Sequence, residues 1–569
     1  MPSFNKVNVH LRHARHYAEV AATAQRLYLQ GGEQAESGLQ RFGQEQGEID
    51  RAWAWARSQP PGGSPAIDNL LVDYANATIH IGDLRYRQRE ERIPQLEAAL
   101  AAAQRVGRKG AEGGFLGGLG AAYAALGDAR GAIQYHEQHL AVARASGNWH
   151  SEAGALGNLG LAHAALGDTR QANACYEQQL AIARKHWDRK GEGSALGNLG
   201  LVNLDLGKPQ RTIEYSEQAL TIMRELGDRR GEASALGNLG LAYVALGEPQ
   251  QTISYMEQTL TAMQELGDQR GVGNALGNLG EAYFDLGNIP QAIAYHKQAL
   301  DVSQAIGDRR AEGQDLGSLG VAYEALGDRA RAISYYERSL EIARQIGDRR
   351  SEEGALNNLG RTYLAQGEFQ QAVTLAEKGL EIARALGDRP GEGNALSILG
   401  VGYGAVGDAQ RTIDYHEQLL EVARELGDRA GESKVLRTLG HAYLAIGAPQ
   451  QAILYCEQAL VIAREIGDRR NEGVVLSAIG MAHKELGDMP QAISYSEEAL
   501  VIAQELADHY GVARAKWNLG LALEAQGELS QAITLMQVLV DHELAAGHPN
   551  ANKDAERVDQ IRARLRAQG

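Results

Sequence analysis

The sequence predicts an all-α solenoid of tandem helix-turn-helix repeats, and three observations lead to this fold class. From residue 108 to residue 547, the 569-residue chain repeats itself every 40 residues without insertion, which gives eleven copies. Within one copy, Leu236, Leu239 and Tyr243 fall at i, i+3 and i+7, the spacing of one face of a helix. Glycine, with 68 residues, recurs at fixed positions of the repeat.

Capping residues predict where the two helices of each copy begin and end. Gly227 is placed to end one helix in the left-handed conformation, and Asp228 to cap the next by accepting a hydrogen bond from a free N–H. Aspartate recurs every 40 residues from Asp188 to Asp508, with Asn148 in the first copy. A central glycine, Gly127 to Gly527, marks the reversal between the two antiparallel helices in all eleven copies.

A second set of glycines falls in the middle of the first helix, from Gly120 to Gly520. Each costs about 1 kcal/mol relative to alanine, so a gain in packing must offset it. We expect the two helices of a copy to approach closely there, against a small residue of the second helix such as Ala132 or Thr252.

The ends of the chain depart from the repeat. Residues 1–65 are expected to form an N-terminal helical cap, with helices at about 8–29 and 33–57 and a breaker, PPGGSP, at 60–65. Residues 66–107 fit a degenerate helical repeat with extra residues near Arg85 to Glu91. Residues 548–569 are expected to form a charged capping helix, because a solenoid needs a polar cap on its last apolar face.

Composition restricts the possible partners. The net charge of −16 disfavours general binding to nucleic acid or to anionic membranes, since both require a basic surface. Two distant cysteines, Cys175 and Cys456, indicate neither a disulfide framework nor a zinc cluster, and are expected to be packing residues. We find no signal-peptide pattern and no run of 18 apolar residues, so we expect a cytoplasmic protein.

The pattern Leu-Gly-x-x-Tyr, then Gly-Asp/Glu, Ala-Ile-x-Tyr and Ala-Leu, resembles the tetratricopeptide repeat (TPR). One copy carries it on Leu236 (in place of the usual Trp), Leu239, Gly240, Tyr243, Gly247, Thr252, Tyr255 and Leu260. Where the usual 34-residue repeat ends with proline, this chain has Arg224, so its second helix is longer, as in kinesin light chains and Pins-type adaptors. The resemblance implies a right-handed superhelix whose first helices line a concave groove that holds peptides.

Candidate binding residues lie on this implied inner face. An asparagine recurs at one position of the first helix and could pair with the backbone of a ligand through its donors and acceptor, or could brace the neighbouring repeat. The asparagines in question are Asn158, Asn198, Asn238, Asn278 and Asn358. In the first six copies the preceding residue is glycine, so we expect a smooth floor there with Leu161, Leu201 and Leu241.

The second half of the array instead places polar and cationic residues on this face. They are Arg361, Asn394, Lys434, Arg437 and His441. Cations inside an acidic protein suggest an acidic ligand segment or a free carboxylate, although drift among duplicated repeats would give the same pattern.

No other motif indicates chemistry. His136, His296 and His416 occupy one position in distant copies, so they cannot share a metal and are expected at the surface. A stripe of glutamates from Glu137 to Glu497 is expected to be a solvated face. Arginine pairs such as Arg229 and Arg230 are expected to bridge to neighbouring glutamates, with an anion-binding edge as the alternative. We therefore predict no catalytic residue, no metal and no cofactor.

These features predict a non-enzymatic scaffold that binds a peptide or helical segment of acidic character. The alternative is a signal-sensing arm of a STAND-type regulatory or defence system, because the N-terminal helices resemble the segment before TPR sensors in those NTPases. The NTPase would then be on another chain, since no GxxxxGK[ST] phosphate loop occurs in this sequence.

Overall fold

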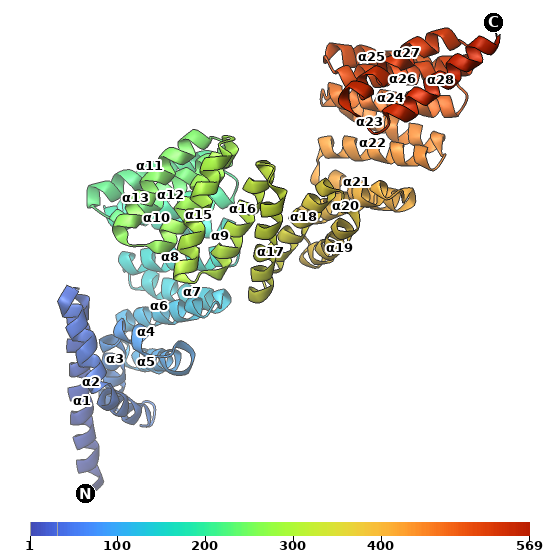
Figure 1. Ribbon diagram of the computed structural model, residues 1–569. Coiled ribbons are helices and arrows are strands. Elements are labelled where there is room, and N and C mark those ends of the chain that lie inside the picture. The colour runs from blue at the N-terminus through green and yellow to red at the C-terminus, as the bar shows by residue number, and fades with distance from the viewer. Residues whose placement is uncertain (1, 31, 569) are drawn as a thin grey trace. The chain divides into compact units, whose positions relative to one another are not determined.

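The computed structural model describes residues 2–30 and 32–568, and every regular element in these ranges is a helix. Contacts divide the chain into two compact units, Met1–Asn288 and Ile289–Gly569. Figure 1 shows successive helices of each unit packed side by side. The fold is a helical solenoid, as predicted.

The first unit opens with five helices and a π-helical turn before the regular repeats. They are α1 (Pro2–Leu29), α2 (Gly32–Arg57), α3 (Pro65–Ala77), α4 (Ile81–Arg85), the π-helix Gln88–Arg92 and α5 (Ile93–Val106). The first helix thus begins at Pro2 and not near residue 8. The π-helix falls where the sequence has its extra residues, and its last residue, Arg92, is 1% exposed. Arg92 Nε donates to Asp83 at 2.7 Å and Nη2 to the Ile79 carbonyl at 2.8 Å, which satisfies the buried guanidinium.

Nine repeat helices complete the first unit. They are α6 (Lys109–Ala125), α7 (Ala129–Ala145), α8 (Trp149–Ala165), α9 (Thr169–Lys185), α10 (Arg189–Asp205), α11 (Pro209–Leu226), α12 (Arg229–Leu246), α13 (Pro249–Leu266) and α14 (Gln269–Asp285). Even-numbered helices are the first helices of their repeats and odd-numbered helices are the second.

The second unit continues this alternation and ends in an additional helix. Its helices are α15 (Ile289–Ile306), α16 (Arg309–Ala325), α17 (Arg329–Ile346), α18 (Arg349–Gln366), α19 (Phe369–Leu386), α20 (Arg389–Ala405), α21 (Ala409–Leu426), α22 (Arg429–Ala445), α23 (Pro449–Glu465), α24 (Arg469–Glu485), α25 (Met489–Glu505), α26 (His509–Gln526), α27 (Leu529–Ala546) and α28 (Ala551–Gln568). In α28, Val558 and Ile561 are buried, and Arg557 donates to Glu524 at 2.9 Å.

Hydrogen bonds at the helix starts confirm the predicted caps. Asp228 accepts from the N–H of Gly231 at 2.9 Å, and Asn148 accepts from the N–H of Ser151 at 3.1 Å. The central glycines from Gly127 to Gly527 all have positive φ, as the predicted reversals require. Trp187 (φ 59°) and Ala507 (φ 51°) take the same conformation at positions where other copies have glycine.

The mid-helix glycines allow the two helices of a repeat to approach, and the expected small residue lies opposite in several copies, as Ala372 does to Gly360 and Ala532 to Gly520 through their carbonyl oxygens. The nearest side chain, however, often comes from another residue. A Cβ on Gly240 would lie 2.5 Å from Met256 Cε, and one on Gly200 would lie 2.5 Å from Ser216 Oγ. We call the space left by the missing Cβ of each of these glycines the notch. It is filled by the residue one helical turn beyond the expected Thr252 or Ala132, namely Met256 or His136. That turn later, the side chain points back toward the glycine. Glycine is therefore required at these positions because a Cβ would overlap with the side chain from the second helix.

The same finding corrects the expectation for the three histidines. His136 and His296 are 2% exposed and His416 is 4% exposed, so none is a surface residue. They occupy the notch-filling position, where His136 lies against Gly120 and His416 against Gly400. Helical periodicity placed them on the second helix, but the glycine notch that receives them is visible only in three dimensions.

Ion pairs link successive helices along one edge of the array, as predicted for the arginines. Glu232 is 8% exposed and accepts from Arg224 at 2.8 Å and from Arg229 at 2.7 Å. The pKa of Glu232 is lowered, first by the hydrogen bond from Arg224, against the opposing effect of burial. Glu192, Glu352, Glu392, Glu432 and Glu472 repeat this arrangement.

Candidate binding surface on the first helices

Several pairs of first helices from consecutive repeats touch one another, whereas among the described residues no pair of second helices makes contacts of similar extent. In the second unit these contacts join α16 to α18, α18 to α20, α22 to α24 and α24 to α26. In a curved solenoid the more closely spaced layer lies on the inner side, so these contacts favour the first helices as the inner layer where they occur. The predicted groove residues lie on these helices.

The asparagine ladder has different environments from repeat to repeat. Asn158 is exposed, and Asn198, Asn238, Asn278 and Asn358 are half-buried. Asn238 Nδ2 donates to the Gly197 carbonyl of the preceding repeat at 3.1 Å. This contact is the bracing role left open by the sequence. Asn358 Oδ1 instead accepts from Arg361 Nη2 at 3.1 Å.

Arg361 is engaged by a neighbouring repeat. Its Nη2 donates to Glu324 Oε2 at 3.2 Å, and the same carboxylate oxygen accepts from the Tyr336 hydroxyl at 3.0 Å. The charge of Arg361 is therefore balanced within the protein. Asn394, on α20, is exposed.

Lys434, Arg437 and His441 lie together along one face of α22, because their spacing of three and four residues follows the helical turn. Lys434 is exposed, and neither Lys434 nor Arg437 has an ion-pair partner within the described ranges. Arg437 Nε is buried without a hydrogen-bond partner, and burial lowers the pKa of this guanidinium.

His441 is exposed, but its imidazole does not behave as a third cation. Desolvation between the helices, together with the positive charges of Arg437 and Arg514, lowers its pKa to about 4. At pH 7 the ring is therefore neutral. It can donate one hydrogen bond and accept another, in place of the charge that the sequence suggested.

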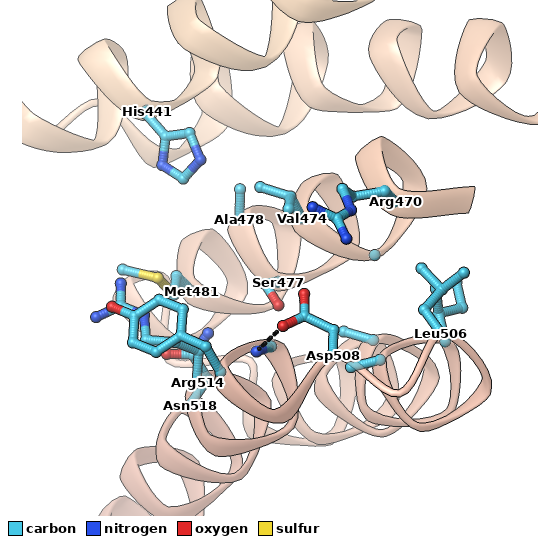
Figure 2. A pocket seen from close by; sticks show the side chains of 16 residues that line it. His441, Arg470, Val474, Ser477, Ala478, Met481, Leu506, Asp508, Arg514 and Asn518 are labelled. Carbon is cyan, nitrogen blue, oxygen red and sulfur yellow. Dashed lines mark hydrogen bonds between the residues drawn. The ribbon is translucent and has the colours of Figure 1, made fainter. Parts of the chain in front are cut away.

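A pocket of about 200 Å³ opens beside His441, between α24, α25 and α26. Its apolar wall includes Ala478, Ile502 and Ala503, all of which are buried, with Val474 and Leu506 more exposed. Figure 2 shows His441 on one side and Arg514, Asn518 and Met481 grouped on another, with Arg470 apart from them. The pocket therefore combines an apolar wall with polar groups at separate places.

The charges around this pocket are not balanced by ion pairs. Arg470 and Arg514 line it and have no carboxylate within 4 Å among the side chains that the structure describes. Asp508 also lines the pocket, and its Oδ1 accepts from the N–H of Gly511 at 2.9 Å. Asn518 is 6% exposed on the same face of α26 as Arg514.

Sequence analysis identified His441, and Arg470 as a member of the arginine pairs, but missed Met481, Tyr510 and Arg514. Arg514 occupies the same repeat position as Lys434, eighty residues earlier, and Met481 the same position as His441. Tyr510 stands where Arg230 and Arg470 stand in other copies. A comparison of each copy with the others at these positions would have found them as departures from the repeat.

No other group of the described residues indicates chemistry. In residues 2–30 and 32–568, no three His, Cys, Asp or Glu side chains gather where they could hold a metal ion. Both cysteines are buried, as expected for packing residues. Glutamates of the predicted stripe, such as Glu217 and Glu257, are exposed, and Glu417 accepts from the hydroxyls of Tyr443 and Tyr455. Within these ranges, no helix combines the length and apolar character that a bilayer span requires.

A family model described as tetratricopeptide repeat matches most of the chain. The matched ranges are 114–185, 192–265, 271–345, 351–411, 391–465 and 471–541. No curated protein matches.

Several solved structures share the repeat fold. A STAND protein with a tetratricopeptide repeat sensor from Pyrococcus horikoshii is 17% identical with a TM-score of 0.46, over 61% of this chain and 54% of that one. The quorum sensor NprR from B. thuringiensis is 16% identical with a TM-score of 0.43, over 63% and 99%. A structure of the nearly identical TPR-like repeats of a kinesin light chain from Podosopora anserina is 21% identical to this chain, with a TM-score of 0.31. The match covers 34% of this chain and 96% of that one.

Proposed function

Because the chain belongs to the tetratricopeptide repeat family, we propose that it is a non-enzymatic protein-interaction scaffold that binds a peptide or helical segment of a partner along its first helices. The partner segment is acidic. The two buried, unpaired cysteines fit a reducing compartment such as the cytoplasm.

One observation carries this proposal: the cations at the repeat edges and Arg361 are paired within the protein, whereas Lys434 and Arg437 on the first-helix face of α22 have no ion-pair partner among the described residues. Arg229, Arg309, Arg349, Arg389, Arg429 and Arg469 each donate to a glutamate of their own repeat. Lys434 and Arg437 have no such acceptor in the described part of the chain. In a protein of net charge −16, a carboxylate on a partner would supply the missing acceptors.

The test uses peptides selected on the full-length chain. A displayed library of random 16-residue peptides is panned against the wild-type protein, and the selected sequences are synthesised with a fluorescent label. We expect them to be enriched in Asp and Glu. We also expect the double variant Lys434→Glu with Arg437→Glu to bind them at least tenfold more weakly, because charge-assisted bonds each contribute about 1.5 to 3 kcal/mol when shielded from water.

The matched control is Glu217→Lys with Glu257→Lys, which reverses two exposed charges on second helices. This variant should bind the selected peptides within twofold of wild type. A gain in affinity in the control variant as large as the loss in the Lys434 and Arg437 variant would show general electrostatics. A loss only in the Glu217 and Glu257 variant would place the partner on the second helices and contradict the proposal. Fluorescence anisotropy gives the affinities, and circular dichroism verifies the fold.

A further inference from the structure

The pocket between α24, α25 and α26 has the size of a single ring. Its volume of about 200 Å³ is slightly larger than that of an engineered cavity of about 150 Å³ that binds benzene. It is smaller than the roughly 300 to 1,000 Å³ of a site for a drug-sized ligand. One aromatic ring, or a branched aliphatic group of similar size, therefore fills the space against Ala478, Ile502 and Ala503.

The two arginines that line the pocket differ in their available partners. In two other repeats the arginine equivalent to Arg470 pairs with the capping aspartate of the next repeat, as Arg310 does with Asp348 at 3.5 Å and Arg350 with Asp388 at 3.9 Å. The corresponding aspartate for Arg470 is Asp508, which lines the same pocket. Asp508 and Arg470 do not form an ion pair within 4 Å, but Asp508 is the carboxylate that lines the pocket at the position where other repeats pair this arginine.

Arg514 has no equivalent acceptor in the pocket. Glu543 on α27 interacts electrostatically with Arg514 but does not line the pocket, and burial and Asp554 raise the pKa of Glu543. Asn518 lies one turn from Arg514, and Figure 2 shows the two side chains together at one end of the pocket. Neutral His441 faces the same space. Together they provide a guanidinium fork, an amide and an imidazole beside an apolar wall.

We propose that this pocket binds a free small carboxylate, with a ring or branched aliphatic group against Ala478, Ile502 and Ala503 and its carboxylate on Arg514 and Asn518. The cation and the apolar wall select for a molecule that has both groups. Asp508 disfavours a second negative charge near Arg470, so the ligand carries one carboxylate. This site is independent of the peptide-binding face proposed above, since Lys434 and Arg437 do not line the pocket.

The experiment measures the binding of 3-phenylpropionate to the full-length protein by isothermal titration calorimetry and saturation-transfer NMR. Its neutral analogue 3-phenylpropanol reports the contribution of the carboxylate. We expect saturable binding of the acid, and binding of the alcohol at least tenfold weaker. No saturable binding of the acid, or equal affinities of acid and alcohol, would overturn the proposal.

Three single variants of the protein test which arginine contacts the carboxylate of the ligand. Arg514→Gln should weaken binding of the acid at least tenfold. Arg470→Gln should change it by less than twofold, because Arg470 lies apart from Arg514 and Asn518, where the ligand carboxylate is placed (Figure 2). Arg230→Gln, at the position of Arg470 in an earlier repeat, is the control outside the pocket. All three side chains are exposed, so the variants should fold. Equal losses from Arg514→Gln and Arg470→Gln would contradict the assigned orientation.

A peptide with a free C-terminal carboxylate tests whether the pocket binds a free small molecule or the C-terminus of a partner protein. The peptide acetyl-Gly-Gly-Phe with a free terminal carboxylate carries the same ring and charge as 3-phenylpropionate. Binding of the free acid with equal or greater affinity supports a small-molecule site. If only the peptide binds, and Arg514→Gln abolishes that binding, the pocket is a subsite for partner chains and the proposal is wrong.

Discussion

The first helices of the earlier repeats and those of the later repeats pack in the same way but present different surfaces. The earlier set is α8, α10, α12 and α14, and the later set is α18, α20, α22, α24 and α26. In the earlier set, Leu161 and Leu201 are exposed, and a Cβ added at Gly197 or Gly277 would have no neighbour within 4 Å. In the later set, Lys434 and Arg514 are exposed and Arg437 is half-buried on the same helix face. The buried residues, by contrast, are alike, with Leu236 at 2% and Leu396 at 0% exposure.

This difference separates two requirements on each repeat. The buried leucines and notch glycines must be repeated because every copy packs against its neighbours in the same way. The exposed positions of the first helix carry no such constraint, so one part of the array can remain uncharged while another acquires cations and a pocket. Function is therefore expected at positions where one copy differs from the rest.

The largest expected effect contrasts two kinds of glycine within the first helices. A Cβ at Gly320 would lie 2.5 Å from Cδ1 of the buried Tyr336 ring, whereas one at Gly277 meets open space. We expect Gly320→Ala to destabilise the protein by about 3 kcal/mol through overpacking. Gly277→Ala should stabilise it by about 0.5 to 1 kcal/mol, the usual gain from replacing a helical glycine. Urea unfolding followed by circular dichroism measures both, and equal effects would contradict the distinction.

The second prediction compares the notch histidines of the two units. Burial lowers the pKa of His136 to about 4, and its Nδ1 has no hydrogen-bond partner among the described residues. His416 Nδ1 instead donates to the Thr412 carbonyl at 2.8 Å, although burial lowers its pKa as well. His136 must be neutral in the fold and takes up a proton on unfolding below its ordinary value near 6.5. Stability from this group is therefore complete above pH 6.5 and falls by about 2 kcal/mol by pH 5.

The variant His136→Tyr tests this assignment, because tyrosine fills the same notch in the copies of Tyr176 and Tyr336. We expect the variant to be as stable as wild type at pH 5 or more so, and to show a smaller loss of stability between pH 7 and pH 5. Urea midpoints across that range measure the difference. An unchanged pH profile would show that other groups cause the acid sensitivity.

Most of the fold was predictable because each copy repeats its own local signals. Capping aspartates, central glycines and apolar spacing gave the helix order, and eleven copies made each signal easy to recognise. The Met256 side chain that fills the space beside Gly240 was not predicted, because sequence spacing does not show where a side chain points across two helices. The burial of His136 was missed for the same reason, because its side chain is buried by contact with Gly120 on the other helix.

The candidate site was predictable only in part. Lys434, Arg437 and His441 departed visibly from the repeat and lie together, but Arg361 is paired with Glu324, a residue 37 positions earlier. Arg514 became relevant only through the pocket, which side chains of α22, α24, α25 and α26 line together. The neutral state of His441 depends on the charges of Arg437 and Arg514 and on desolvation, neither of which the sequence shows.

A smaller effect is expected from the ion pairs at the repeat edge, which both units share. Burial opposes ionisation of Glu432, but hydrogen bonds from Arg424 and Arg429 outweigh it and lower its pKa. Glu432→Gln should destabilise the protein by about 1.5 kcal/mol, a value at the lower limit for charged hydrogen bonds because both arginines are half-exposed. Glu232→Gln in the first unit should cost a similar amount in urea unfolding. A much larger loss in one variant would show that the edges of the two units are not equivalent.

The smallest expected effect concerns the two residues that take a glycine conformation without being glycine. Trp187 and Ala507 have φ of 59° and 51°, which costs a residue with a Cβ about 1 kcal/mol. Trp187 is 88% exposed, so its indole gains little burial in return. Trp187→Gly relieves the strain but increases the freedom of the unfolded chain, so the net gain should be about 0.5 kcal/mol, and Ala507→Gly should gain the same. Urea midpoints decide the comparison. A loss of stability in Trp187→Gly alone would show that its ring contributes a contact in the folded protein that its exposure does not indicate.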